Sequence, residues 1–132
     1  MNKLTNKGQS LAIFIVFIPF FIMMGTFVID MAYAKYIKVK INEMTKMIIK
    51  YGLNNIDNEP YNEMVDLIYQ NDEEVDDYKI EIDSENKKIT MTIKKASKGI
   101  FSSLIGKDIY NEKSSYKGYI ENEKIIIEEV EE

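Results

Sequence analysis

The stretch that decides the fold is residues 11–51, LAIFIVFIPFFIMMGTFVIDMAYAKYIKVKINEMTKMIIKY. Its first part, from Leu11 to Ile29, is a run of 19 residues without a charge. As an α-helix this run is roughly 28 Å long, close to the bilayer hydrocarbon thickness of about 30 Å. It is longer than the apolar core of a secretory signal, and no A-x-A-like cleavage site follows it. The run therefore predicts a membrane-spanning helix, with a kink at Pro19.

Beyond Asp30 the pattern changes to that of an amphipathic helix. Apolar side chains recur at steps of three or four positions, which places them on one face: Tyr33, Ile37, Ile41, Met44, Ile48 and Tyr51. Neither proline nor glycine interrupts residues 26–51, and Gly52 is a natural helix stop. We predict one helix over residues 9–51, roughly 60 Å long. Ile37, Ile41, Met44 and Ile48 are its expected contacts with a sheet.

Charge and composition exclude several functions. Residues 1–51 carry a net charge of +5 and residues 52–132 a net charge of −10. An acidic outer half argues against nucleic acid as a partner. The chain has no cysteine and no histidine, so it lacks disulfides, thiolate metal sites and the commonest general base. No serine lies in a nucleophile motif, so we predict no catalytic residue, cofactor or small-molecule substrate.

Residues 52–132 read as a small α+β domain. Asn58-Glu59-Pro60 is expected to open a short helix that ends at Gln70, with Tyr61, Met64, Val65 and Ile68 on its apolar face. Residues 71–77, NDEEVDD, read as a solvated acidic loop; calcium binding is the alternative, although the spacing of an EF-hand is missing.

Alternating patterns predict the sheet. Residues 78–83 and 88–94 form a hairpin around a turn at 84–87, and strands are expected near residues 116–120 and 124–130. Residues 99–106, GIFSSLIG, carry an apolar set that is expected to cap the core, with a partner contact as the alternative: Ile100, Phe101, Leu104 and Ile105. Because so small a domain is marginal alone, the amphipathic half of the long helix is expected to complete its core. The fold class is α+β: a long N-terminal helix on a small antiparallel sheet, with one short extra helix.

The start of the apolar run, GQSLAIFIVFIP at residues 8–19, resembles the TadE/TadG-like proteins of tight-adherence (Flp-type) pilus systems, a branch of the type IV pilin superfamily. The resemblance implies cleavage by a prepilin peptidase between Gly8 and Gln9, which makes residues 1–8 a leader peptide. It also implies an assembly helix whose matching positions are Phe14, Pro19, Gly25 and Asp30. The order of residues 88–120 fits the tail of such proteins.

One position departs from the family pattern. Many pilins have glutamate at the fifth mature position, where this chain has Ile13. In pilins that glutamate is thought to pair with the ammonium of a neighbouring subunit inside the bilayer. Its absence argues against a bulk filament subunit.

The resemblance implies a minor pilin or pseudopilin whose partners are other pilin-like subunits and the assembly machinery. It also implies a cytoplasmic N-terminus and an extracytoplasmic domain, which lysine counting alone does not resolve: Lys3 and Lys7 lie on one side of the apolar run and Lys35, Lys38 and Lys40 on the other. An unprocessed, single-pass surface protein that senses or adheres is the alternative. A membrane-bound enzyme is the third reading.

Overall fold

The computed structural model describes the chain except for residues 1, 98, 101–103, 105–109 and 132; residues 2–6 and 110 are described by their backbone alone. The helices are α1 (Asn2–Asn54), the 3₁₀ turn η1 (Ile56–Asn58) and α2 (Tyr61–Asn71). The strands are β1 (Asp77–Asp83), β2 (Lys88–Ser97), β3 (Tyr110–Glu121) and β4 (Lys124–Glu129). The α+β fold class is confirmed: a long N-terminal helix lies on a four-stranded antiparallel sheet, with one short helix beside it.

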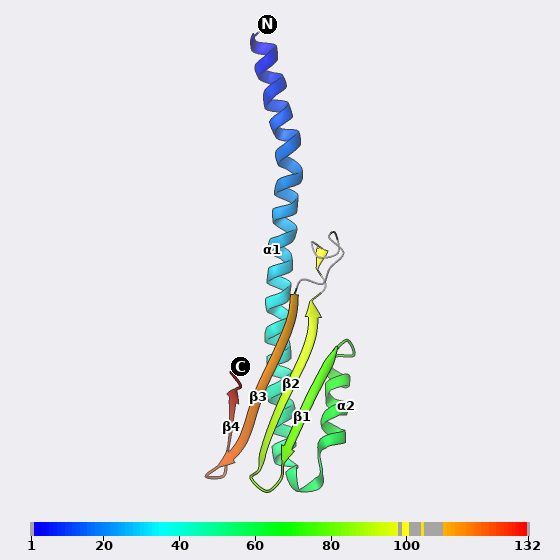
Figure 1. Cartoon of the computed structure of the whole chain (residues 1–132), viewed down its shortest axis with the longest axis vertical. Coiled ribbons are helices and arrows are strands. Elements are labelled where there is room, and N and C mark those ends of the chain that lie inside the picture. The colour runs from blue at the N-terminus through cyan, green and yellow to red at the C-terminus, as the bar shows by residue number, and fades with distance from the viewer. Residues whose placement is uncertain (1, 98, 101–103, 105–109, 132) are drawn as a thin grey trace.

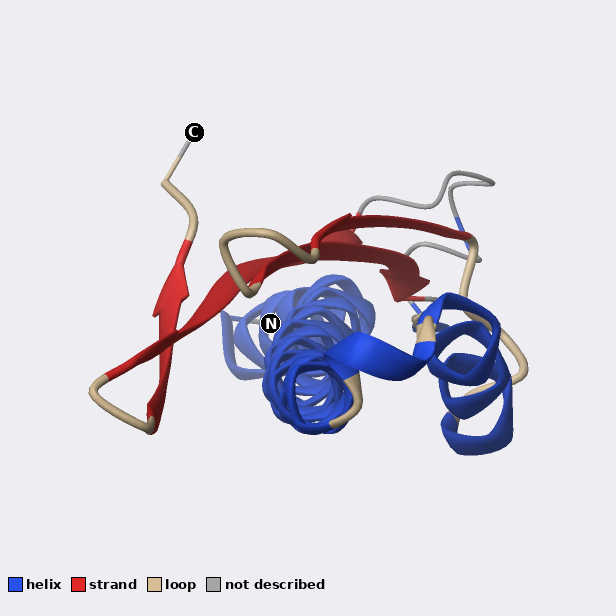
Figure 2. Cartoon of the chain, turned by 90° about the horizontal axis from the view of Figure 1, so that it is seen from below, coloured by secondary structure: helices blue, strands red, loops and turns tan. Residues whose placement is uncertain are grey.

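The four strands follow one another as an antiparallel meander in the order β1-β2-β3-β4. The predicted first hairpin is confirmed, with Asp83 opposite Lys88 at its turn and Asp77 opposite Lys94 at its open end. In the second hairpin Glu121 pairs with Lys124. Helices α1 and α2 lie on the same face of the sheet, and the edge strand β4 stands to the side of α1 (Figure 2). The N-terminal half of α1 projects beyond the sheet (Figure 1).

The second half of α1 supplies one wall of the core. The four residues expected there, Ile37, Ile41, Met44 and Ile48, are all buried in the main apolar cluster. They pack with the alternate side chains of β2 that point toward the helix, which are Ile89, Met91 and Ile93. The apolar side chains that repeat along the helix and those that alternate along β2 therefore pack together in one core layer.

The predicted apolar face is wrong at its first position. Tyr33 is exposed and stacks on Tyr36 with ring centroids 6.1 Å apart, whereas Ala34 is buried. At the other end Tyr51 is half-buried and packs against the core as predicted, and its hydroxyl donates a hydrogen bond of 2.6 Å to Glu63. An α-helix has 3.6 residues per turn, so each step of four residues rotates a side chain about 40° past a full turn. Two such steps separate Tyr33 from Ile41, and they place Tyr33 outside the buried face.

The bounds of α1 also differ from the prediction. The helix begins at Asn2 instead of near residue 9, and Pro19 lies inside it as predicted. It does not stop at Gly52 but continues to Asn54. Gly52 is buried, and a β-carbon there would lie 2.6 Å from Met64 Sδ and 2.7 Å from Ile89 Cδ1. The glycine therefore permits close packing of α2 and β2 against α1 instead of ending the helix.

The start of α2 is also corrected. Asn58 closes the 3₁₀ turn, and Pro60 occupies the N-cap position without a side-chain hydrogen bond. Of the predicted apolar face, Met64 and Ile68 are fully buried, while Tyr61 is exposed. Tyr61 therefore marks the solvent side of this helix.

Gly118 of β3 lies directly against α1. A β-carbon there would lie 2.3 Å from Ile49 Cγ2 and 3.0 Å from Leu53 Cδ1. We expect Gly118→Val to overpack this contact and to lower the free energy of unfolding by about 1–3 kcal/mol. Lys117→Val is the control because it introduces the same side chain on the outward face of the same strand, and the part-exposed Lys117–Glu128 ion pair that it breaks is worth only about 0–1 kcal/mol. Equal stability of the two variants in denaturant titrations would contradict the prediction.

Candidate functional site

The exposed half of α1 is the largest apolar surface among the described residues. Every large apolar side chain from Leu11 to Ile29 that the structure describes is exposed. The helix is long and apolar enough to cross a membrane, with a mean hydropathy of 2.7 over its most apolar part. Such a surface is unstable in water, so it requires lipid or other apolar helices around it.

The residues assigned to assembly by resemblance lie on this half. Ile13 and Phe14 are exposed, and nothing lies within 4 Å of a β-carbon built on Gly8 or Gly25. Gln9 is also exposed. The residues around the expected cleavage point, and Ile13, Phe14 and Gly25 beyond it, are thus open to the surroundings.

Asp30 differs from the other members of the assembly set. Its residue is only 1% exposed, and its Oδ1 accepts a hydrogen bond of 2.7 Å from the Ile100 backbone N–H. A β-carbon on Gly99 would lie 2.2 Å from Asp30 Cγ, so only glycine allows this approach. Asp30 therefore joins the long helix to the start of the β2–β3 connection. Sequence reasoning missed this contact, although Asp30, Ala34, Ile37 and Ile41 share one helical face.

The apolar connection does not cap the core as expected. Ile100 is 53% exposed and Leu104 is 71% exposed. Phe101 and Ile105, which belong to the same prediction, lie outside the described residues. The prediction of a core cap is therefore wrong for Ile100 and Leu104, because β2 and β3 already close the core with their own side chains.

The acidic segment at 71–77 is not simply a solvated loop. Asp72 is buried, and its Oδ2 lies 2.5 Å from Lys95 Nζ of β2, which is also buried. Asp72 Oδ1 accepts a hydrogen bond of 3.0 Å from the Glu74 N–H, and Asp76 accepts one of 2.6 Å from the Ala96 N–H. The segment is thus fastened to β2 by its carboxylates.

The surroundings of Asp72 lower the pKa of its carboxyl group. Burial alone raises the pKa of this carboxyl, but the hydrogen bonds from Lys95 and the Glu74 N–H, with the charges of Lys95 and Lys40, lower it further than burial raises it. The net result is a pKa below the ordinary value, so Asp72 stays ionised in the fold. No group of three or more acidic side chains in the described residues is arranged to hold a metal ion.

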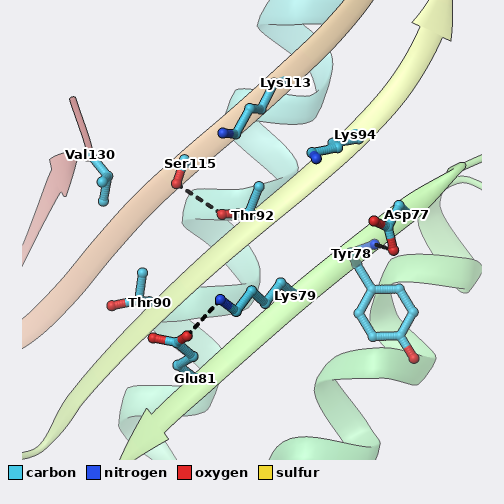
Figure 3. A pocket seen from close by; sticks show the side chains of 10 residues that line it. All are labelled: Asp77, Tyr78, Lys79, Glu81, Thr90, Thr92, Lys94, Lys113, Ser115 and Val130. Carbon is cyan, nitrogen blue, oxygen red and sulfur yellow. Dashed lines mark hydrogen bonds and ion pairs between the residues drawn. The ribbon is translucent and has the colours of Figure 1, made fainter. Parts of the chain in front are cut away.

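The outward face of the sheet carries a shallow polar groove over β1, β2 and β3 (Figure 3). Thr92 and Ser115 share a hydrogen bond of 2.9 Å across the groove, and Lys79 lies 2.9 Å from Glu81 along its edge (Figure 3). Lysines, hydroxyls and carboxylates make up most of its lining, and two pairs of them bond each other. This arrangement is that of a solvated sheet face.

A long N-terminal apolar helix packed on a four-stranded antiparallel sheet is a pilin-like architecture. The membrane-length half is exposed, and the other half is a structural part of the domain. Comparisons of the chain with protein-family models, with curated proteins and with solved structures find no match.

Proposed function

We propose that this chain is a minor pilin or pseudopilin-like component of a tight-adherence pilus or a related secretion apparatus, of the TadE/TadG-like kind. One observation carries the proposal: a single helix supplies both an exposed apolar half of membrane length and the wall of a small sheet domain. A subunit built in this way is held in the membrane before assembly and presents its domain outside. Its action is by contact with other pilin-like subunits and the assembly machinery, and it needs no catalytic group.

The proposed topology has the N-terminus in the cytoplasm and residues 52–132 outside. It rests on the resemblance of residues 8–19 to a prepilin cleavage region, because the processing enzyme works on the cytoplasmic side. In this proposal residues 1–8 are removed and Gln9 becomes the first residue. The N-terminal sequence of the protein from its native membrane tests this directly.

Replacing Gly8 with leucine is expected to leave the leader attached. A peptidase that must reach this peptide bond needs a small residue with an accessible backbone. Gly25→Leu is the matched control, since a β-carbon at either glycine has nothing within 4 Å. Mass spectrometry of the intact chain should show residues 1–132 for Gly8→Leu and residues 9–132 for the control. If wild-type protein also retains Met1, an unprocessed anchored surface protein becomes the better description.

Expressed alone with a peptidase and assembly machinery, the chain is expected to make no filaments. Cleavage would leave an ammonium on Gln9, and Ile13, one helical turn further, carries no charge to pair with it. A buried ammonium without a partner costs several kcal/mol, and a homopolymer would repeat that cost in every subunit. A neighbour with a carboxylate at the equivalent position would remove the cost.

Electron microscopy of cells that express the wild type or Ile13→Glu tests this charge argument. The variant restores a carboxylate at the fifth mature position and should assemble more readily than the wild type. Abundant filaments composed only of the wild-type chain would show that the missing carboxylate is unimportant.

A further inference from the structure

The β2–β3 connection begins at the boundary of the apolar half of α1. Ile100 N–H bonds to Asp30, and Asp30 directly follows Ile29, the last residue of the charge-free run. The ends of β2 and β3 that flank this connection lie at the end of the sheet nearest the N-terminal half of α1 (Figure 1). If the run from Leu11 to Ile29 fills the hydrocarbon layer, Ile100 lies in the headgroup zone.

The chemistry of this connection suits that zone. Ile100 and Leu104 are 53% and 71% exposed although both are fully aliphatic. The sequence from Gly99 to Gly106 has no charged residue, and Lys98 and Lys107 bracket it. An uncharged stretch that carries large apolar residues between lysines has a composition that suits shallow insertion into a membrane surface.

The Asp30 contact gives a reason for the arrangement. A carboxylate at the end of a membrane-spanning segment is costly if it faces lipid. In the fold it is 1% exposed, and the Gly99–Ile100 backbone lies against it. The same contact that covers the carboxylate holds Ile100 beside the membrane boundary. Ile100 therefore lies next to the end of the apolar surface of α1.

We propose that Ile100 and Leu104 form a second membrane contact, which inserts into the lipid headgroup layer beside α1 and fixes the tilt of the domain against the bilayer. The occupant of this surface is lipid, not another protein chain. A domain held by a single helix can tilt about the point where the helix leaves the bilayer. A second contact with the bilayer beside that point restricts this tilt. The inference rests on the membrane-spanning role of α1 that the proposed function includes, and it is independent of pilus assembly.

Tryptophan substitution tests the proposal in the full chain, which has no tryptophan of its own. Ile100→Trp and Leu104→Trp each place one fluorophore on the proposed contact. Val39→Trp is the matched control, because Val39 is also 53% exposed but lies nine residues beyond Asp30, about 14 Å along the helix. Phe17→Trp reports on the membrane-spanning half. Near-UV circular dichroism of the tyrosines verifies that each variant is folded.

Each variant is reconstituted in phosphatidylcholine nanodiscs that hold one copy, with and without brominated acyl chains. We expect bromine to quench the fluorophores at positions 100 and 104 several-fold more strongly than the one at position 39, and acrylamide in water to show the reverse order. Replacing part of the phosphatidylcholine with phosphatidylglycerol should leave this order unchanged.

The failures are distinguishable. If Phe17→Trp is not quenched by bromine, the membrane-spanning role itself is wrong. If Phe17→Trp is quenched but positions 100 and 104 behave like position 39, only the second contact is overturned. A second set of larger nanodiscs holds several copies of the chain. If positions 100 and 104 are protected from acrylamide only in that set, the occupant is another copy of the chain, and the lipid proposal is equally overturned.

Discussion

Ile41→Asp is expected to lower the free energy of unfolding of the domain by several kcal/mol. Ile41 is fully buried between α1 and the sheet. The substitution removes an apolar contribution of about 1.5–3 kcal/mol and leaves a carboxylate in an apolar site. Small domains have total stabilities of only about 5–15 kcal/mol, so the variant should be largely unfolded or close to it.

Val39→Asp is the control for this prediction. It places the same carboxylate on the same helix two residues away, but at a side chain that is exposed. The full chain in detergent can be unfolded with urea and followed by near-UV circular dichroism, because all nine tyrosines lie beyond Asp30. The loss in Ile41→Asp should shrink at low pH, where the introduced carboxyl is protonated. Similar midpoints for the two variants at pH 7 would show that the helix face is not part of the core.

Lys95→Met is expected to destabilise the domain by about 3–5 kcal/mol, because it leaves the buried Asp72 carboxylate without its partner. Replacing both residues, as in Asp72→Leu with Lys95→Met, should recover much of that loss, because no unpaired charge is then buried. Lys79→Met is the control: the Lys79–Glu81 pair is exposed, and breaking such a pair changes stability by about 0–1 kcal/mol.

The pH dependence separates a buried charge from lost packing. In the wild type the pKa of Asp72 is lowered, so its contribution to stability is present above its unfolded pKa of about 3.9 and is lost as the pH falls through the folded value. In Lys95→Met burial is expected to raise the pKa of Asp72 instead, so the penalty is present at pH 7 and disappears as the carboxyl protonates. The stability difference between the two proteins should therefore narrow from pH 7 toward pH 3. A difference that stays constant over that range would assign the effect to packing.

The parts of the fold that follow from local periodicity were accessible from the sequence alone. The spacing of Ile37, Ile41, Met44 and Ile48 defines a helix face, and all four lie in the core. The alternation around residues 78–83 and 88–94 defines a hairpin, and the strands pair there. Both patterns reflect the geometry of a single element, in which side chains repeat every 3.6 or 2 residues whatever the rest of the chain does. The length of the charge-free run is equally a local property.

The tertiary structure alone decided what the polar and small residues do. The partner of Asp72 lies 23 positions away in β2, and that of Asp30 lies 70 positions away. Contacts between residues so far apart do not follow from the periodicity of a helix or a strand, so the sequence pattern does not reveal them. Gly52 resembles a helix stop in sequence, but in the fold it makes room for Met64 and Ile89. The role of a carboxylate or a glycine depends on which residues of other elements lie next to it. Those neighbours are determined only when the sheet packs on the helix.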